Sequence, residues 1–108
     1  MKSVLKEAEK IVVGTRRLDY GTPRQNHGCT AELWTSFFKR RGVLKEDAVL
    51  IPEDVCFANI LQKISRSANK ITRDNLVDIS GYAENVEIIQ NDKPRKHKKR
   101  VYGLGTAR

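Results

Sequence analysis

The sequence has few cysteines, few aromatic residues and no long apolar run, and each shortage excludes a class of protein. Its two cysteines, Cys29 and Cys56, form no C-x-x-C pair and have no zinc-ligand spacing with His27 or His97. A disulfide scaffold and a structural zinc site are therefore not expected. No segment approaches about 18 consecutive apolar residues, and the charged N-terminal segment has no signal-peptide core, so we expect a cytoplasmic protein without membrane spans.

The common nucleotide-binding and metalloprotease motifs are also missing. The chain contains no P-loop, no G-x-G-x-x-G and no H-E-x-x-H sequence. Its 108 residues, 39% of them hydrophobic, are enough for one small domain with a limited core. Because so small a core leaves little stability to spare, we expect a homo-oligomer.

Positive charge is concentrated at the C-terminal end. Residues 91–108 hold seven Lys or Arg and one acid, whereas residues 1–90 hold fourteen bases and twelve acids. We therefore predict a helical domain over residues 1–90 and a basic tail over residues 91–108. The densest part of the tail contains Lys96, Lys98, Lys99 and Arg100. Such a tail can bind nucleic acid through phosphate contacts, or it can serve only solubility, and both interpretations stay open.

Four segments with apolar residues at helical spacing predict an all-α fold, a small bundle of about four helices. The expected helices cover residues 3–13, 22–42, 52–68 and 72–90. The second begins with Thr22, Pro23 and Gln25, which together form a capping box with proline at the first helical position. Thr72 is the expected cap of the last helix.

Each helix has an apolar stripe that we expect to face the core. In the second helix the stripe is His27, Ala31, Trp34 and Phe38, broadened by Leu33 and Phe37. In the third it is Phe57, Ile60, Leu61, Ile64 and Ala68, and in the fourth it is Leu76, Ile79, Ala83 and Val86. His27 on an apolar face predicts an interior histidine with its hydrogen bonds satisfied.

The last two helices also carry charged residues that share a face. Asp74 and Asp78 lie one turn apart and repel each other, so a nearby cation should compensate them. If the two helices pack as an antiparallel hairpin, Arg66 comes near Asp74 and Lys63 comes near Asp78. Tyr82 continues the same face of the last helix.

Three interpretations of this cluster stay open. The first is an internal salt-bridge network that fixes the register of the helices. The second is a phosphate site in which Arg66 forms paired hydrogen bonds and Lys63 adds a point charge. The third is a Mg²⁺ site in which Asp74 and Asp78 supply oxygen ligands, with help from Asp54 or Glu32. The second and third can coexist.

The loop before the second helix offers a place for a base. Asp19 and Tyr20 precede Gly21, and Asn26 follows one helical turn later. Tyr20 could stack on a base while Asn26 hydrogen-bonds its edge. Alternatively, Tyr20 is simple hydrophobic cover for the bundle.

These motifs resemble those of a family of small phage and prophage proteins, over about residues 4–85. The resemblance rests on Asp19-Tyr20-Gly21, Pro52-Glu53-Asp54-Val55, Lys63-Ile64-x-Arg66 and Asp74-Asn75-Leu76-Val77-Asp78-Ile79-x-Gly81-Tyr82. It implies a phage origin, and therefore action in the cytoplasm of a bacterial host.

A looser similarity is to the MazG-type all-α nucleoside triphosphate pyrophosphohydrolases. That similarity implies carboxylates on neighbouring helices of an oligomer, which hold Mg²⁺ on a triphosphate that water attacks. The sequence departs from the E-x-x-E pattern of that family, because Asp74 and Asp78 are four residues apart.

Together these features predict a phage-encoded helical protein that binds a nucleotide. The expected ligand contacts are Lys63, Arg66, Asp19, Tyr20, Asn26 and Tyr82, with Asp74, Asp78 and Asp54 for Mg²⁺. The protein would either hydrolyse the nucleotide or sequester it as a sponge against host defence. The alternative is a protein that binds nucleic acid or inhibits a host protein through its basic tail.

Overall fold

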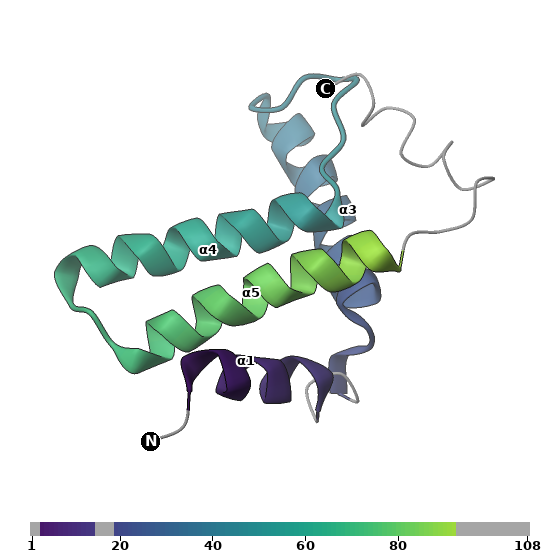
Figure 1. Cartoon of the computed structure of the whole chain (residues 1–108). Coiled ribbons are helices and arrows are strands. Elements are labelled where there is room, and N and C mark those ends of the chain that lie inside the picture. The colour runs from purple at the N-terminus through teal and green to yellow at the C-terminus, as the bar shows by residue number, and fades with distance from the viewer. Residues whose placement is uncertain (1–2, 15–18, 93–108) are drawn as a thin grey trace.

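The all-α prediction is confirmed by a computed structural model, which describes residues 3–14 and 19–92. Its helices are α1 (Val4–Val13), α3 (Pro23–Arg41), α4 (Pro52–Asn69) and α5 (Arg73–Asn91). Helices α4 and α5 form an antiparallel hairpin, α1 lies along the other side of α5, and α3 crosses the end of the hairpin that is remote from its turn (Figure 1). The described part of the chain contains no strand.

The helices begin and end at the predicted signals. The Thr22 hydroxyl accepts a hydrogen bond from the Gln25 backbone N–H at 3.1 Å, and the Gln25 side chain accepts one from the Thr22 N–H at 3.0 Å. Thr72 caps α5 by accepting from the Asn75 N–H at 3.1 Å. Gly42 ends α3 at φ 78°, a left-handed conformation that glycine adopts without strain.

The first turn of α4 has a different cap. Ile51 precedes Pro52 and has no side-chain acceptor, so the Asp54 carboxylate reaches back and accepts the Ile51 N–H at 3.0 Å. A carboxylate in the first turn also interacts favourably with the helix dipole. The role of Asp54 in this structure is therefore to start a helix.

Arg24 ties the beginning of α3 to the end of α5. Its guanidinium donates to the Ile89 carbonyl at 2.7 Å and to the Asp92 carbonyl at 3.1 Å. These carbonyls belong to the last turn and cap of α5, which have few partners within their own helix. These two hydrogen bonds therefore hold α3 across α5, with the start of α3 over the C-terminal half of α5.

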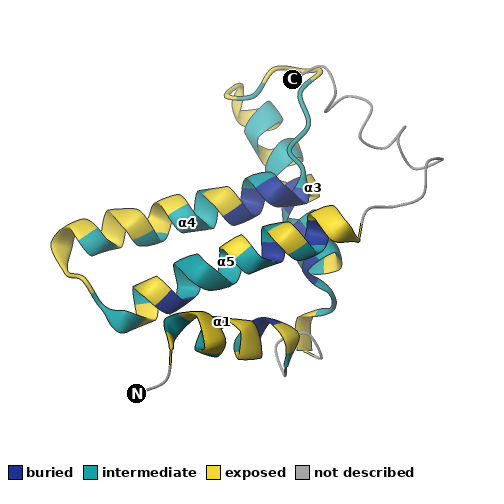
Figure 2. Ribbon diagram, viewed as in Figure 1, coloured by how far each residue is buried: buried dark blue, intermediate teal, exposed yellow. Residues whose placement is uncertain are grey.

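The core is small and lies where α3 meets the hairpin and α1. Its buried apolar residues are Ala8, Val12, Ala31, Val55, Cys56, Val77 and Ile89. Buried residues of α4 are confined to the end that α3 covers, and the other end is mostly exposed (Figure 2). None of the helices in the described ranges is long and apolar enough to cross a membrane.

The predicted core stripes of α3, α4 and α5 are wrong in part. His27 and Ala31 are buried as predicted, but Leu33 and Phe37 are exposed. Phe57, Leu61 and Ile64 of α4 are 53%, 65% and 52% exposed, and Leu76 of α5 is also exposed. Helix α3 packs on the other side of the hairpin, so nothing in the described chain covers the exposed side chains of α4 and α5. Val77 and Ile89, which the stripes did not include, are buried instead.

Candidate functional site

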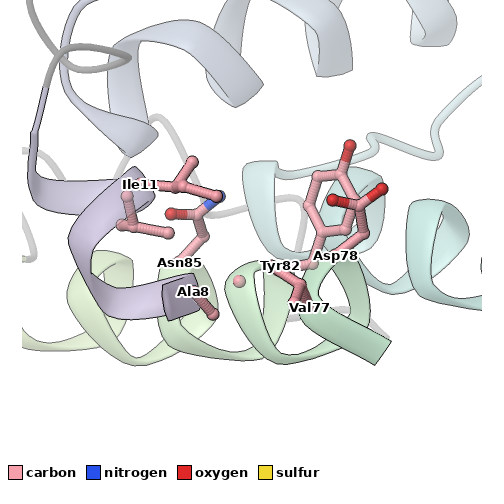
Figure 3. Close-up of a pocket in the computed structure, with 8 residues that line it drawn as sticks. Ala8, Ile11, Val77, Asp78, Tyr82 and Asn85 are labelled. Atoms are coloured by element: carbon pink, nitrogen blue, oxygen red, sulfur yellow. The ribbon is translucent and has the colours of Figure 1, made fainter. Parts of the chain in front are cut away.

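Two adjoining hollows follow α5 and form the candidate site, which we call the α5 cleft. The larger, about 80 Å³, is lined by Val12, Tyr20, Gly21, Pro23, Asn26, His27, Tyr82 and Asn85. The smaller, about 30 Å³, is lined by Ala8, Ile11, Val12, Val77, Asp78, Gly81, Tyr82 and Asn85 (Figure 3). Because both are lined by Val12, Tyr82 and Asn85, the two hollows are neighbours along one helix.

A buried polar pair forms the floor of the cleft. The Asn85 amide nitrogen lies 3.1 Å from Nε2 of His27, and both residues are buried. With the amide nitrogen as donor, Nε2 of the imidazole is the acceptor. The prediction that His27 is an interior histidine with a hydrogen-bond partner is therefore confirmed.

The Tyr82 ring is positioned by the same histidine. The ring centroids of Tyr82 and His27 are 6.0 Å apart at 64°, an edge-to-face contact. Tyr82 and Asp78 lie one turn apart on α5 and project in the same direction, away from α1 (Figure 3). A carboxylate, an aromatic ring and an amide, from Asp78, Tyr82 and Asn85, thus follow one another along the cleft.

Gly81 allows α1 to form one wall. A Cβ atom at this position would lie 3.6 Å from the Val12 side chain and 4.0 Å from that of Ala8, which is ordinary contact distance. Any larger side chain would push α1 away from α5. The close approach encloses the smaller hollow.

The structure brings together three ligand residues that were predicted from separate segments. Tyr20, Asn26 and Tyr82 all line the larger hollow. Tyr20 is 60% exposed, so its ring is not hydrophobic cover for the core. Asp19 is exposed and does not line either hollow.

The predicted pairing of Lys63 with Asp78 is present. Their Nζ and Oδ2 atoms are 3.0 Å apart, and the Lys63 side chain is 15% exposed. Asp78 belongs to the cleft, so this ion pair places a cation beside it. The geometry agrees with both the salt-bridge and the phosphate interpretations.

The second expected pair, Arg66 with Asp74, does not form in the described residues. Both residues are exposed. Arg66 follows Lys63 by three residues and so points about 60° further round the helix, away from α5. At this end of the hairpin, Arg73 instead forms an ion pair with Glu7 of α1, at 2.9 Å.

The predicted set of three metal ligands is not assembled. Asp54 lies in the first turn of α4, at the opposite end of the hairpin from Asp74, and it caps Ile51. Glu32 is exposed on α3. Across residues 3–14 and 19–92, no group of three or more His, Cys, Asp or Glu residues could hold a metal ion. Asp54 therefore does not join Asp74 and Asp78.

Comparison with known proteins places the chain in a family. The sequence profile described as a domain of unknown function (DUF6378) matches residues 3–90, which include α1, α3, α4 and all of α5 except its last residue. The chain belongs to the DUF6378 family. The residues of the α5 cleft all lie within the DUF6378 match.

Relatives of this DUF6378 chain occur in mycobacteriophages, which confirms the prediction of a phage protein family. The Gene 55 protein of Mycobacterium phage L5 is 38% identical over 98 residues, covering 90% of this chain and 58% of that protein. The Gene 55 protein of Mycobacterium phage D29 is 32% identical over 92 residues, covering 84% and 56%. The chain thus spans a little over half the length of these relatives. No solved structure matches it.

The structure does not test the predicted basic tail. Helix α5 ends at Asn91, and Lys96, Lys98, Lys99 and Arg100 lie outside the described residues.

Removing the buried amide of the cleft should destabilise the DUF6378 fold. Asn85→Ala is expected to lower the free energy of unfolding by about 1–3 kcal/mol, because it takes a hydrogen bond from the buried His27 ring. Urea unfolding followed by circular dichroism measures this loss. The matched control is Asn59→Ala in α4, where the asparagine is only half-buried. Equal stability of the two variants would contradict the structural role of the pair.

Proposed function

We propose that this chain binds a nucleotide in the α5 cleft. The observation that carries the proposal is the convergence of Tyr20, Asn26 and Tyr82 on one hollow whose floor is the His27 and Asn85 pair. Tyr20 lies in the short segment before α3, Asn26 in α3 and Tyr82 in α5. Aromatic faces and amide edges are the groups that recognise bases in proteins.

The size of the cleft limits how the base enters. A volume of about 80 Å³ corresponds to roughly two or three water molecules, so it accepts the edge of a ring. The Asn26 amide can donate to and accept from that edge. The exposed Tyr20 ring is then available to stack on the face of the base, which contributes about 1–3 kcal/mol in other proteins.

The phosphates would extend along the hairpin. Lys63 lies beside the cleft through its ion pair with Asp78, and Arg66 offers an exposed guanidinium one turn further along α4. Guanidinium and ammonium groups are the usual partners of phosphate oxygens. Mg²⁺ is commonly held by one or two carboxylates together with substrate phosphates, so Asp74 and Asp78 would serve as its protein ligands.

Binding is tested by calorimetric titration of the full chain with ATP, GTP, CTP and UTP, each with Mg²⁺. Asn26→Ala should raise the Kd of the bound nucleotide about tenfold, because one hydrogen bond to the base contributes about 1.4 kcal/mol. Asn59→Ala, the same change on α4 outside the cleft, should leave the Kd unchanged. Absence of binding for all four nucleotides, or equal Kd values in both variants, refutes the proposal.

Product analysis in the same titrations separates an enzyme from a binder. Release of pyrophosphate and monophosphate would make the protein a MazG-like pyrophosphohydrolase. Tight retention without turnover would make it a nucleotide sponge, which fits a phage protein directed against a nucleotide signal of its host.

The basic tail supports a second candidate, nucleic-acid binding. Deleting residues 93–108 removes seven Lys or Arg residues. If the tail binds DNA or RNA, the deletion abolishes a salt-sensitive affinity, whereas the nucleotide affinity of the cleft stays the same.

A further inference from the structure

We propose that the α5 cleft selects nucleotides whose base carries an exocyclic amino group, as adenine and cytosine do, and that the Asn85 amide oxygen selects them. The inference rests on the proposed nucleotide site and names the class of base that this site accepts. It depends on one acceptor in the floor of the cleft to which no described residue donates.

The Asn85 amide is held in one orientation by His27. The amide nitrogen lies 3.1 Å from Nε2 of the His27 ring, and with Nε2 as the acceptor the amide oxygen points away from the ring. Turning the amide over would place its oxygen against the lone pair of Nε2, which two acceptors disfavour. The edge-to-face contact with Tyr82 also holds the His27 ring in place. The position of the Asn85 oxygen is therefore fixed before a ligand arrives.

This oxygen is buried without a protein donor. Asn85 is 8% exposed, and within residues 3–14 and 19–92 the contact with His27 is its one side-chain hydrogen bond. A buried acceptor without a donor is costly and uncommon in folded proteins. Because Asn85 lines both hollows of the cleft, a molecule that enters them reaches it. The oxygen therefore requires an N–H or O–H donor from water or from a ligand.

The size of the larger hollow favours an amino group as that donor. A volume of about 80 Å³ holds roughly two or three water molecules, so only a group that projects from the base enters it. An exocyclic amino group projects in this way, has two N–H donors and can take the place of one water. An oxo group at the same position would bring a second acceptor against the Asn85 oxygen and leave it unpaired.

Asn26 lies in the same hollow and completes the match to an amino base. In adenine and cytosine the ring atom next to the carbon that bears the amino group is a nitrogen with a free lone pair. The Asn26 amide can donate an N–H to this nitrogen while the Asn85 oxygen accepts from the amino group. In uracil the ring N–H is recessed between two oxo groups, so it does not reach the buried oxygen.

Two pairs of nucleotides test the proposal on the natural protein by calorimetric titration with Mg²⁺. ATP has an amino group at C6 where inosine triphosphate has an oxo group, and CTP and UTP differ in the same way at C4. ATP should bind roughly 10–100-fold more tightly than inosine triphosphate, and CTP more tightly than UTP, because the oxo group leaves the Asn85 oxygen without a donor. Equal Kd values within each pair overturn this inference and leave the nucleotide site standing. Binding of none of the four overturns both.

A substitution assigns the selection to Asn85. Asn85→Leu keeps a similar shape without the acceptor, so the ratio of the Kd values for inosine triphosphate and ATP should fall to about one. A general loosening of the cleft would weaken both ligands alike and leave this ratio unchanged. Asn59→Ala, outside the cleft on α4, should keep the ratio of the natural protein. A folded Asn85→Leu variant that keeps the full ratio overturns the role of Asn85.

A second variant covers the case in which circular dichroism shows Asn85→Leu to be unfolded. Asn85→Asp keeps an oxygen acceptor at the same place in the cleft, so it should keep the preference for ATP over inosine triphosphate. Loss of the preference in this variant contradicts the assignment.

Discussion

Ile89→Ala is expected to lower the free energy of unfolding by about 3 kcal/mol, a shift of about 150-fold in the folding equilibrium. Ile89 is 0% exposed and lies in the last turns of α5, where α3 crosses it. The truncation leaves a cavity that few neighbours can fill, because the core contains only a few side chains. Arg24 donates to the backbone carbonyl of Ile89, so this hydrogen bond survives the substitution.

Urea unfolding measures the effect against a matched control. Ile71→Ala makes the same chemical change at a position that is 76% exposed, in the turn between α4 and α5. It should change the free energy by less than about 0.5 kcal/mol. Similar losses in the two variants would show that the core does not centre on the contact between α3 and α5.

Cys56 is expected to resist thiol reagents by several orders of magnitude relative to Cys29. Cys56 is fully buried, and burial, with a smaller contribution from the Glu53 charge, raises the pKa of its thiol from 9.0 to about 12. At pH 8 only about one in ten thousand such thiols is ionised, and the thiolate is the reactive form. Cys29 is exposed. One thiol per chain should therefore react in the native protein and two in denaturant.

The Cys29→Ser variant isolates this behaviour. Its remaining thiol should react only as the fold opens. When opening is fast and global, adding Ile89→Ala should accelerate labelling of Cys56 by the same factor of about 150. Rapid labelling of the Cys29→Ser protein would show that the end of α4 is not packed as described.

The same thiol gives a pH dependence of stability. Between pH 9 and about 12 the unfolded chain loses the Cys56 proton while the folded chain retains it. The unfolded state therefore binds fewer protons, and the contribution of this group to stability falls as the pH rises through that range.

The ends of the helices could be predicted because their signals are local. The capping box of Thr22 and Gln25 and the Thr72 cap pair free backbone N–H groups of their own helices, and Gly42 ends α3. The structure places each of them as predicted. The ion pair of Lys63 with Asp78 could also be predicted, because a short turn between two helices leaves little choice of neighbours.

The tertiary structure decided which apolar and polar residues meet. Helical spacing identified the stripe of Phe57, Leu61 and Ile64 but not what lies against it, and α3 packs on the other side. Asp54 caps α4 and does not join Asp74, and His27 meets Asn85 from 58 residues away. The sequence by itself thus determined where each helix begins and which of its faces are apolar, since those depend on neighbours within a few residues. Which face is buried depends on how helices distant in the chain cross, and only the folded arrangement settles that.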